Sequence, residues 1–443
     1  MSIEIEHCPA GHSSYSEDSI RYGRCSLCTR EHFIQEFKTW SSGNDRIDMI
    51  IQESQINSVY GKLQWIPYVN FQNIEHIEDG GHGSVNSAKL ENGIKANWNF
   101  IKQDWEFDLI GAKVALKEIK DFRYDIAEFL KVIKTINNYE FTEYYGISKN
   151  PSTQNYIIVM ILFDYDLHNY LTKTFWDLEW LSKIDILVSI VQGLESLHAK
   201  DFIHCDFHSG NIFINDKLDP YNSDFRIDLG SVRLKNDSIL NVNNKTNKIY
   251  GLIPYIPPEV LRGNEFTRKG DIYSFGGIMY EIITAQRPFA DQAHDTYLMM
   301  DICNGVRPTV PDFMLNWIPE WYLNLMYRCW SDDLSERPTS VELSNSFWDV
   351  LVKLDNNIVD NDVMRQFKIA DENQKNASKS QKQELFELFS YSSKLHPQSC
   401  YISRYIHTFH GLHYLLEDLI SGKSADPNLL LKSNESITSA TYV

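Results

Sequence analysis

The feature that most constrains this chain is the run from His204 to Asn211 (His-Cys-Asp-Phe-His-Ser-Gly-Asn), followed seventeen residues later by Asp228-Leu229-Gly230. The run supplies a carboxylate, Asp206, and an amide, Asn211, and Asp228 adds a second carboxylate. Oxygen ligands of this kind suit a hard cation such as Mg²⁺. A positioned carboxylate beside such a cation can also accept the proton of an attacking hydroxyl group. Phosphoryl transfer needs this combination, because it depends on positioning and electrostatic stabilisation.

One short motif is weak evidence, since such runs also occur by chance in polar loops. Two upstream segments belong to the same pattern. Val114-Ala115-Leu116-Lys117 places a cation at the end of an apolar run, although alone it is equally a surface lysine after a buried strand. The run from Gly80 to Val85 is rich in glycine, which lets backbone amides approach phosphates closely, although alone it is equally a hairpin turn.

Taken in order, these segments resemble the motif set of eukaryotic protein kinases. Downstream, Pro257-Pro258-Glu259 resembles the A-P-E motif, and Arg337 stands where that family keeps an arginine to pair with the motif's glutamate. The resemblance covers about residues 71–350 and is strongest to fungal tyrosine-kinase-like serine/threonine kinases. It implies a bilobal α+β fold, with a strand-rich N-lobe and a helical C-lobe. It also implies that Asp271 holds the backbone of the catalytic loop.

The resemblance implies ATP and Mg²⁺ as cofactors and a hydroxyl group of a protein as the acceptor. Asp206 would be the catalytic base, and Asn211 and Asp228 would hold Mg²⁺. Lys117 would pair with the α and β phosphates and with a helix carboxylate, for which Glu128 is the candidate. The residues expected to contact the nucleotide are Gly80, Gly81, Gly83, Val85, Ala115, Lys117, Met160, Ile161 and Phe163.

The sequence departs from the family pattern at several positions. Glu78 stands in place of the first glycine, Cys205 in place of an arginine, and His208 in place of a lysine. The usual register of the helix places Val132 where a glutamate is expected, which is why Glu128, one turn earlier, is the candidate. These departures leave open the alternative of a pseudokinase that acts as an ATP-binding or scaffold module.

Residues 1–35 contain a second possible site. The spacing Cys25-x-x-Cys28 can present two thiolates to one metal ion, and a turn carrying Cys8 and His12 could complete a tetrahedral zinc site. His7 and His32 are rival ligands. The predicted zinc-ribbon-like segment competes with a metal-free tail, and a further alternative makes this segment the functional core and the kinase region an accessory.

The rest of the chain is divided into a helical linker over 36–70, the kinase domain over 71–352, and a polar linker with a C-terminal tail over 353–443. Within the last part, the polar composition of 371–383 favours a linker, and 402–420 is predicted to form short amphipathic helices. His407, His410 and His413 recur every third residue, but no thiol or carboxylate is clearly grouped with them, which disfavours a metal site.

Composition narrows the possible partners of the 443 residues. A net charge of −18 without a long basic stretch argues against nucleic acid or an anionic membrane surface. The longest apolar run is too short to cross a bilayer, and the acidic start lacks a signal-peptide pattern. Seven cysteines, an odd number, favour a reducing compartment, so the cytoplasm is expected. The oligomeric state is not predicted.

Overall fold

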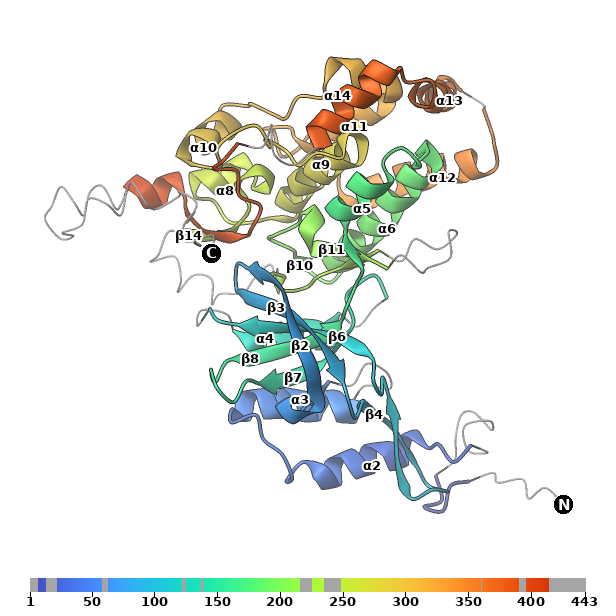
Figure 1. The fold of residues 1–443 in the computed structure, drawn as a ribbon, viewed down its shortest axis with the longest axis vertical. Helices are drawn as coiled ribbons and strands as arrows, with labels where there is room; N and C mark the ends of the chain where they lie inside the picture. The colour runs from blue at the N-terminus through green and yellow to red at the C-terminus, as the bar shows by residue number, and fades with distance from the viewer. Residues whose placement is uncertain are drawn as a thin grey trace, which may run out of the picture. The chain divides into compact units, whose positions relative to one another are not determined.

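The structure is a computed structural model of the full chain, and it describes residues 7–12, 22–57, 63–121, 125–136, 139–215, 225–234, 248–359, 361–389 and 396–413 (Figure 1). The chain divides into two compact units, Met1–Leu162 and Phe163–Val443. The first unit is built on a β-sheet and the second on helices. This composition confirms the predicted strand-rich N-lobe and helical C-lobe.

A six-stranded sheet forms the core of the first unit. Its spatial order is β1-β7-β8-β6-β3-β2, with every neighbouring pair antiparallel except β1 and β7. The bounds of these strands are β1 Gln64–Trp65, β2 Phe71–Gly80, β3 Gly83–Leu90, β6 Lys113–Ile119, β7 Tyr144–Lys149 and β8 Tyr156–Ile161. Leu90, Val114 and Val159 are fully buried between these strands, as expected for β-branched and aliphatic residues on a packed face.

Two helices of the first unit pack against each other. Helix α4 (Ile126–Thr135) is capped by Asp125, whose side chain accepts two backbone N–H groups of the first turn. Helix α3 (Asp45–Asn57) lies along it, and ion pairs Arg46–Asp125 and Lys134–Glu53 connect the two helices. The region predicted as a helical linker therefore contributes a helix that is part of this unit.

The N-terminal segment is attached to an insertion that the sequence patterns did not predict. Between β3 and β6 the chain forms a hairpin of β4 (Ile94–Asn99) and β5 (Asp104–Asp108), and helix α2 (Ser26–Glu36) packs against it (Figure 1). The ring of His32 stacks on Trp98, with centroids 3.6 Å apart. The indole N–H of Trp105 donates to Glu36 at 2.8 Å. Aromatic side chains of the hairpin thus hold helix α2 through ring stacking and a hydrogen bond.

The second unit is assembled around helix α9, every residue of which from Gly270 to Thr284 is buried. A helix covered on all sides is typical of the centre of a large helical domain. The helices of this unit are α5 Leu167–Thr174, α6 Trp180–Ala199, α8 Pro258–Arg262, α9 Arg268–Thr284, α10 Thr296–Cys303, α11 Glu320–Cys329, α12 Ser340–Asp355, α13 Asp362–Lys375 and α14 Lys379–Phe389. Within the described ranges, none of the chain's helices combines the length and apolar character needed to span a bilayer.

Helix α13 corrects the prediction of a polar linker over 371–383. Met364, Phe367 and Ala370 recur at helical spacing and are almost fully buried. Asp371 accepts the backbone N–H of Trp180 at 2.9 Å, so the helix is also tied to the start of α6. The prediction was wrong because the apolar stripe of this helix ends just before residue 371, and the residues that continue the helix are polar.

Short strands position the loops of the second unit. The bounds of these strands are β9 Tyr165–Asp166, β10 Phe202–Ile203, β11 Ile212–Ile214, β12 Arg226–Ile227, β13 Arg233–Leu234, β14 Lys248–Gly251 and β15 Arg404–His407. Strand β11 pairs with both β12 and β9, and β10 pairs with β13. Strand β15 comes from the C-terminal region, which was predicted to be helical here, and pairs antiparallel with β14.

Candidate active site

A hairpin-like strand pair brings Asn211 and Asp228 together. Asn211 directly precedes β11 and Asp228 directly follows β12, and Ile212 lies opposite Ile227 in this antiparallel pair. The backbone N–H of Asp228 donates to the carbonyl of Asn211 at 2.9 Å. Asp228 is buried and Asn211 is half-buried. Two oxygen-bearing side chains that are far apart in sequence therefore lie next to each other.

The catalytic loop before Asn211 is held by Asp271 from helix α9. Its carboxylate accepts the backbone N–H groups of His204 at 2.9 Å and Cys205 at 3.1 Å, and it also contacts His198 Nε2 at 3.0 Å. Cys205 has a φ of +67°, a left-handed conformation that is costly for a residue with a Cβ atom. The structure thus agrees with the role expected for Asp271, since its hydrogen bonds stabilise the strained turn.

His204 links this loop to Asp228. Burial lowers the pKa of His204, so the imidazole is neutral and has one N–H group. Its Nε2 lies 2.9 Å from the carbonyl oxygen of Asp228, to which it donates, and its Nδ1 accepts from the backbone N–H of Asp206. One neutral ring therefore fixes the backbone at both acidic residues.

Asp206 is buried and surrounded by hydrogen-bond donors. The amide nitrogen of Asn211 donates to its backbone carbonyl at 2.8 Å, His208 Nε2 lies 3.4 Å from Oδ1, and the hydroxyl of Ser403 donates to Oδ1 at 3.0 Å. Burial alone would raise the pKa of Asp206, but the charge of His208 and hydrogen bonds from His208 and Ser403 outweigh it, and the pKa is lowered. The carboxylate is therefore ionised and already in contact with a hydroxyl group.

An ion pair beneath the same loops has the geometry expected from the sequence. Arg337 is fully buried, and its two terminal nitrogens donate to the two oxygens of Glu259 at 2.7 and 2.9 Å. Its remaining donors reach the carbonyls of Lys269 and Ser331. A bidentate pair whose arginine also donates to two backbone carbonyls can be buried without a large penalty, and it anchors the start of α8.

The predicted nucleotide-contacting residues of the first unit share one face of its sheet. Val85 lies opposite Lys117, and Ala115 lies opposite Met160, while Ala115 and Lys117 are two residues apart on β6. Residues opposite each other or two apart on a strand point to the same side, so these four form one surface. A Cβ atom on Gly83 would lie 1.9 Å from the carbonyl oxygen of Glu118, so only glycine fits there.

The remaining predicted contacts are divided between the two units. Gly80 ends β2 and Gly81 lies in the following turn, whereas Ile161 ends β8. Phe163 is the first residue of the second unit and stacks on Phe213 with ring centroids 5.4 Å apart.

The predicted pairing of Glu128 with Lys117 is wrong. The carboxylate of Glu128 forms ion pairs with Arg46 of α3 and with Lys131 one turn further along α4. It lies in the first turn of α4, where the half-exposed side chain is within reach of the neighbouring helix. The sequence did not show that α3 supplies a competing cation.

The profile of the protein tyrosine and serine/threonine kinase family matches residues 71–347, more than half of the chain. The chain belongs to this family. Relatives of this kinase include "Probable serine/threonine-protein kinase roco5" of Dictyostelium discoideum, 27% identical over 67% of this chain and 10% of the relative. From the same organism, "Probable serine/threonine-protein kinase kinX" is 27% identical over 66% of this chain and 25% of the relative. "Stress-activated protein kinase alpha", also from that organism, is 26% identical over 62% of this chain and 41% of the relative. The chain thus spans less than half the length of each of these relatives.

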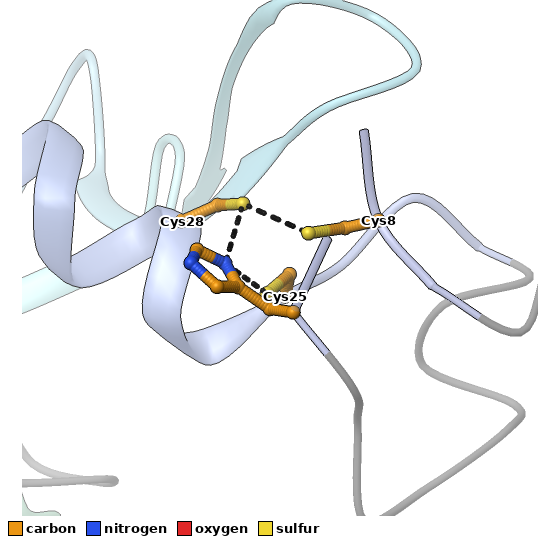
Figure 2. Close-up of side chains that lie close together, drawn as sticks. Cys8, Cys25 and Cys28 are labelled. Atoms are coloured by element: carbon orange, nitrogen blue, oxygen red, sulfur yellow. Dashed lines mark hydrogen bonds between the residues drawn. The ribbon is translucent and has the colours of Figure 1, made fainter. Parts of the chain in front are cut away.

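The N-terminal region of this kinase holds a second cluster of chemically active side chains. Cys8, His12, Cys25 and Cys28 each offer one ligand atom, and these four atoms lie within 4.8 Å of one another (Figure 2). Cys28 Sγ is 3.5 Å from both Cys8 Sγ and His12 Nδ1. A tight turn, in which the N–H of Gly11 donates to the carbonyl of Cys8, brings the first two residues together. The four predicted ligands are therefore adjacent.

The donor set of this cluster fits a zinc ion. Burial raises the pKa of the Cys28 thiol, and the neighbouring Cys8 and Cys25 thiols raise it further, because adjacent thiolates repel one another without a cation. None of these cysteines is in a disulfide. The rival ligand His32 stacks on Trp98 instead. Among the described residues, including His407, His410 and His413, no other such ligand group is found.

Ser403 is the site residue that the sequence interpretation missed. It precedes β15, is buried, and is the hydroxyl donor to Asp206. The available signal was the run Tyr401-Ile-Ser-Arg-Tyr-Ile-His407, which is rich in aromatic and β-branched residues and therefore typical of a strand. That signal was overlooked, and residues 402–420 were predicted to form short amphipathic helices.

Proposed function

We propose that this chain is an active protein kinase that transfers the γ-phosphoryl group of ATP to serine or threonine hydroxyl groups of proteins in intracellular signalling. One observation carries the proposal: an ionised, buried Asp206 lies 3.0 Å from a hydroxyl group that donates to it. That distance is within the range at which a general base accepts a proton.

Asp206 is the proposed base. Its carboxylate orients the acceptor hydroxyl and receives its proton as the new oxygen–phosphorus bond forms. His208 Nε2 contacts the same carboxylate oxygen, and so it supports the ionised form and fixes its orientation. The family's lysine is absent at this position, and His208 supplies a shorter basic side chain in its place.

Asn211 and Asp228 are the proposed Mg²⁺ ligands, and Lys117 the proposed partner of the α and β phosphates. The amide nitrogen of Asn211 is engaged by the carbonyl of Asp206, which leaves the amide oxygen as the atom suited to a cation. Mg²⁺ bound with ATP neutralises charge on the phosphates. The shared face of Val85, Ala115, Lys117 and Met160 suits the proposed nucleotide contacts, because it combines apolar side chains with one cation.

We further propose a structural zinc ion held by Cys8, His12, Cys25 and Cys28. Four protein ligands fill a tetrahedral shell, which is typical of structural rather than catalytic zinc. The seven cysteines are all unpaired, which supports a reducing compartment such as the cytoplasm. ATP and a protein substrate are the proposed partners, and the net charge of −18 disfavours nucleic acid and anionic membranes.

A pseudokinase is the second candidate, and the position of Glu128 is the observation that favours it. Glu128 pairs with Arg46 and Lys131, and Cys205 and His208 replace residues of the family's catalytic loop. Thermal unfolding of the chain with and without Mg²⁺ and ATP separates the candidates. A stabilisation that is lost in Asp228→Asn supports the kinase, and no stabilisation supports the pseudokinase.

Transfer of labelled phosphate to a mixture of serine- and threonine-containing proteins tests the proposal directly. Asp206→Asn should lower the rate by at least about 100-fold, because the base is lost while the shape is kept. Asp201→Asn is the matched control, since Asp201 is an exposed carboxylate paired with Arg268. Equal activity of wild type and Asp206→Asn would contradict the proposed mechanism.

A further inference from the structure

The C-terminal region of the chain adds a strand to the loop that follows the catalytic centre. Residues Arg404–His407 of β15 pair with Lys248–Gly251 of β14 in antiparallel register, so that Gly251 lies opposite Arg404 and Ile249 opposite Ile406. Adding a strand to an exposed edge is a common way in which proteins bind extended peptides. Here the extended peptide belongs to the same chain.

This strand places a hydroxyl group directly on the proposed base. Ser403 Oγ donates to Asp206 Oδ1 at 3.0 Å and lies 3.1 Å from His208 Nε2. The side chain is 9% exposed, so water has little access to it. The hydroxyl therefore occupies the position that the mechanism above assigns to an acceptor.

Specific contacts on the N-terminal side of Ser403 hold the segment in this register. The backbone N–H of Cys400 donates to His294 Nδ1 at 3.0 Å, while His294 Nε2 donates to the carbonyl of Phe289. The Tyr401 hydroxyl donates to the carbonyl of Pro288 at 3.0 Å, and its ring lies 4.8 Å from the guanidinium of Arg287. The loop between α9 and α10 thus forms a binding site for the C-terminal segment that contains Ser403.

The C-terminal side of Ser403 is packed as tightly as a protein core. Ile406 is fully buried, and His407 and Thr408 are less than a tenth exposed. The rings of Tyr250 and Tyr405 meet edge to face at 5.1 Å. Gly263 has a φ of +118°, and a Cβ atom there would lie 2.8 Å from Cβ of His410. Because its contacts are buried and its register is fixed, this segment is bound at the catalytic centre in the way that a peptide ligand would be.

We propose that residues 396–413 are an intramolecular substrate, with Ser403 as the phosphate acceptor, an inference that rests on the kinase activity proposed above. In this step Ser403 Oγ forms a bond to the γ-phosphorus of ATP, the bond from that phosphorus to the β-γ bridging oxygen breaks, and ADP leaves. The hydroxyl proton passes to the Asp206 carboxylate and from there to solvent.

The product of this step cannot stay where the hydroxyl was. A phosphate of charge about −2 would lie against the Asp206 carboxylate, and His208 is the basic side chain in contact with Ser403. One imidazole does not balance these charges, so transfer expels the tail and opens the site to other proteins. Until then the tethered tail competes at an effective concentration of about 1 mM, which lowers the activity toward external proteins.

The test uses the full chain with Mg²⁺ and ATP and follows phosphate on Ser403 by mass spectrometry. The fraction modified per unit time should stay constant when the protein is diluted about 100-fold, because the acceptor is tethered. Ser403→Ala should abolish this modification, whereas Ser399→Ala, four residues upstream on the same segment, should not. A rate that falls in proportion to dilution would overturn the intramolecular assignment.

A second measurement replaces Ser403 with a permanently charged residue, and its hydrogen-exchange readout needs no nucleotide. Ser403→Glu should increase hydrogen exchange of the backbone amides in 248–251 and 404–407 and raise turnover of an external peptide by about tenfold. Ser399→Glu should do neither. If external protein is phosphorylated while Ser403 never is, the inference fails and the kinase proposal stands. If the chain transfers phosphate to no acceptor, the kinase proposal fails and the acceptor role of Ser403 falls with it.

Discussion

The two ends of this chain are attached to the kinase domain by different forces. The N-terminal segment packs its thiols and aromatic rings against a hairpin, with His32 on Trp98 and Phe33 beside Trp105. The C-terminal segment lies along strand β14 and directs a hydroxyl group to Asp206. The first contact set touches no residue of the proposed chemistry, and the second touches its centre.

This difference indicates that the N-terminal segment is attached permanently, whereas the C-terminal strand can be released. The proposed four-ligand metal site, together with the stacked rings, has no step in the kinase reaction that would open it. A strand held by backbone pairing and one catalytic contact can be displaced by a single charge. We therefore expect the N-terminal segment to respond to metal supply and the C-terminal strand to respond to turnover.

Removal of the metal should give the largest effect. Structural zinc supplies about 10 kcal/mol or more to small modules, so a chelator or Cys28→Ser should unfold residues 7–12 and 22–36 and expose the β4–β5 hairpin to hydrogen exchange. Cys303→Ser, at a half-buried thiol outside the cluster, is the control. Exchange in β14 and β15 should not change. Protection of the hairpin that survives chelation would contradict the zinc proposal.

The second largest effect is expected from shortening Ile406, the buried side chain that anchors the C-terminal strand. Ile406→Ala removes a fully buried side chain and should cost about 2–5 kcal/mol of docking free energy, because a cavity replaces close packing. Limited proteolysis and hydrogen exchange of 396–413 measure this opening. Ile402→Ala is the matched control, since that side chain is 49% exposed. Equal opening in both variants would mean that β15 is not held by its buried face.

Helix α13 sharpens the comparison, because it is a C-terminal element that should not be released. Lys183 of α6 donates to Gln374 of α13 at 2.6 Å, and burial lowers the pKa of Lys183 to about 8, although Asp371 and Glu179 nearby oppose the shift. Between pH 8 and its ordinary value of 10.5, the unfolded chain holds a proton that the folded chain has lost. Stability therefore rises with pH in this window.

The free energy of unfolding is expected to rise by about 3 kcal/mol across this window, because each pKa unit corresponds to roughly 1.4 kcal/mol. Chemical denaturation at pH 8 and pH 10.5 would measure it, with Lys183→Met as the variant that should lack the rise. Lys173→Met is the control, because Lys173 is a surface lysine over the Tyr165 ring. The same pH dependence in wild type and Lys183→Met would show that this lysine does not titrate as its burial implies.

The sequence predicted the parts of this molecule whose residue types have one chemical use. Asp206, Asn211 and Asp228 were predicted to form one site because several motifs occur in one order along the chain, and the structure brings these three residues close together. Elements that depend on a partner far along the chain were not predictable. Glu128 was assigned to Lys117 because no local sequence pattern indicates that Arg46 lies beside it.

The same reasoning explains the errors in the C-terminal region. The pairing of β15 is decided by the exposed edge of β14, which no local pattern reveals. Local periodicity therefore favoured a helix over residues that form a strand. His32 is a related case, because its chemistry made it a rival metal ligand, whereas Trp98, more than sixty residues away, determines its position.

His32 provides the smallest and most selective test of the comparison. His32→Ala removes the stacking on Trp98 and should cost about 0.5–1.5 kcal/mol of the attachment between α2 and the hairpin, without removing a metal ligand. Zinc content should therefore stay at one ion per chain while exchange of β4 and β5 increases slightly. His76→Ala, at an exposed imidazole on β2, controls for the loss of a ring. Loss of zinc in His32→Ala would return His32 to the ligand set and show that the stacked ring, rather than His12, completes the metal site.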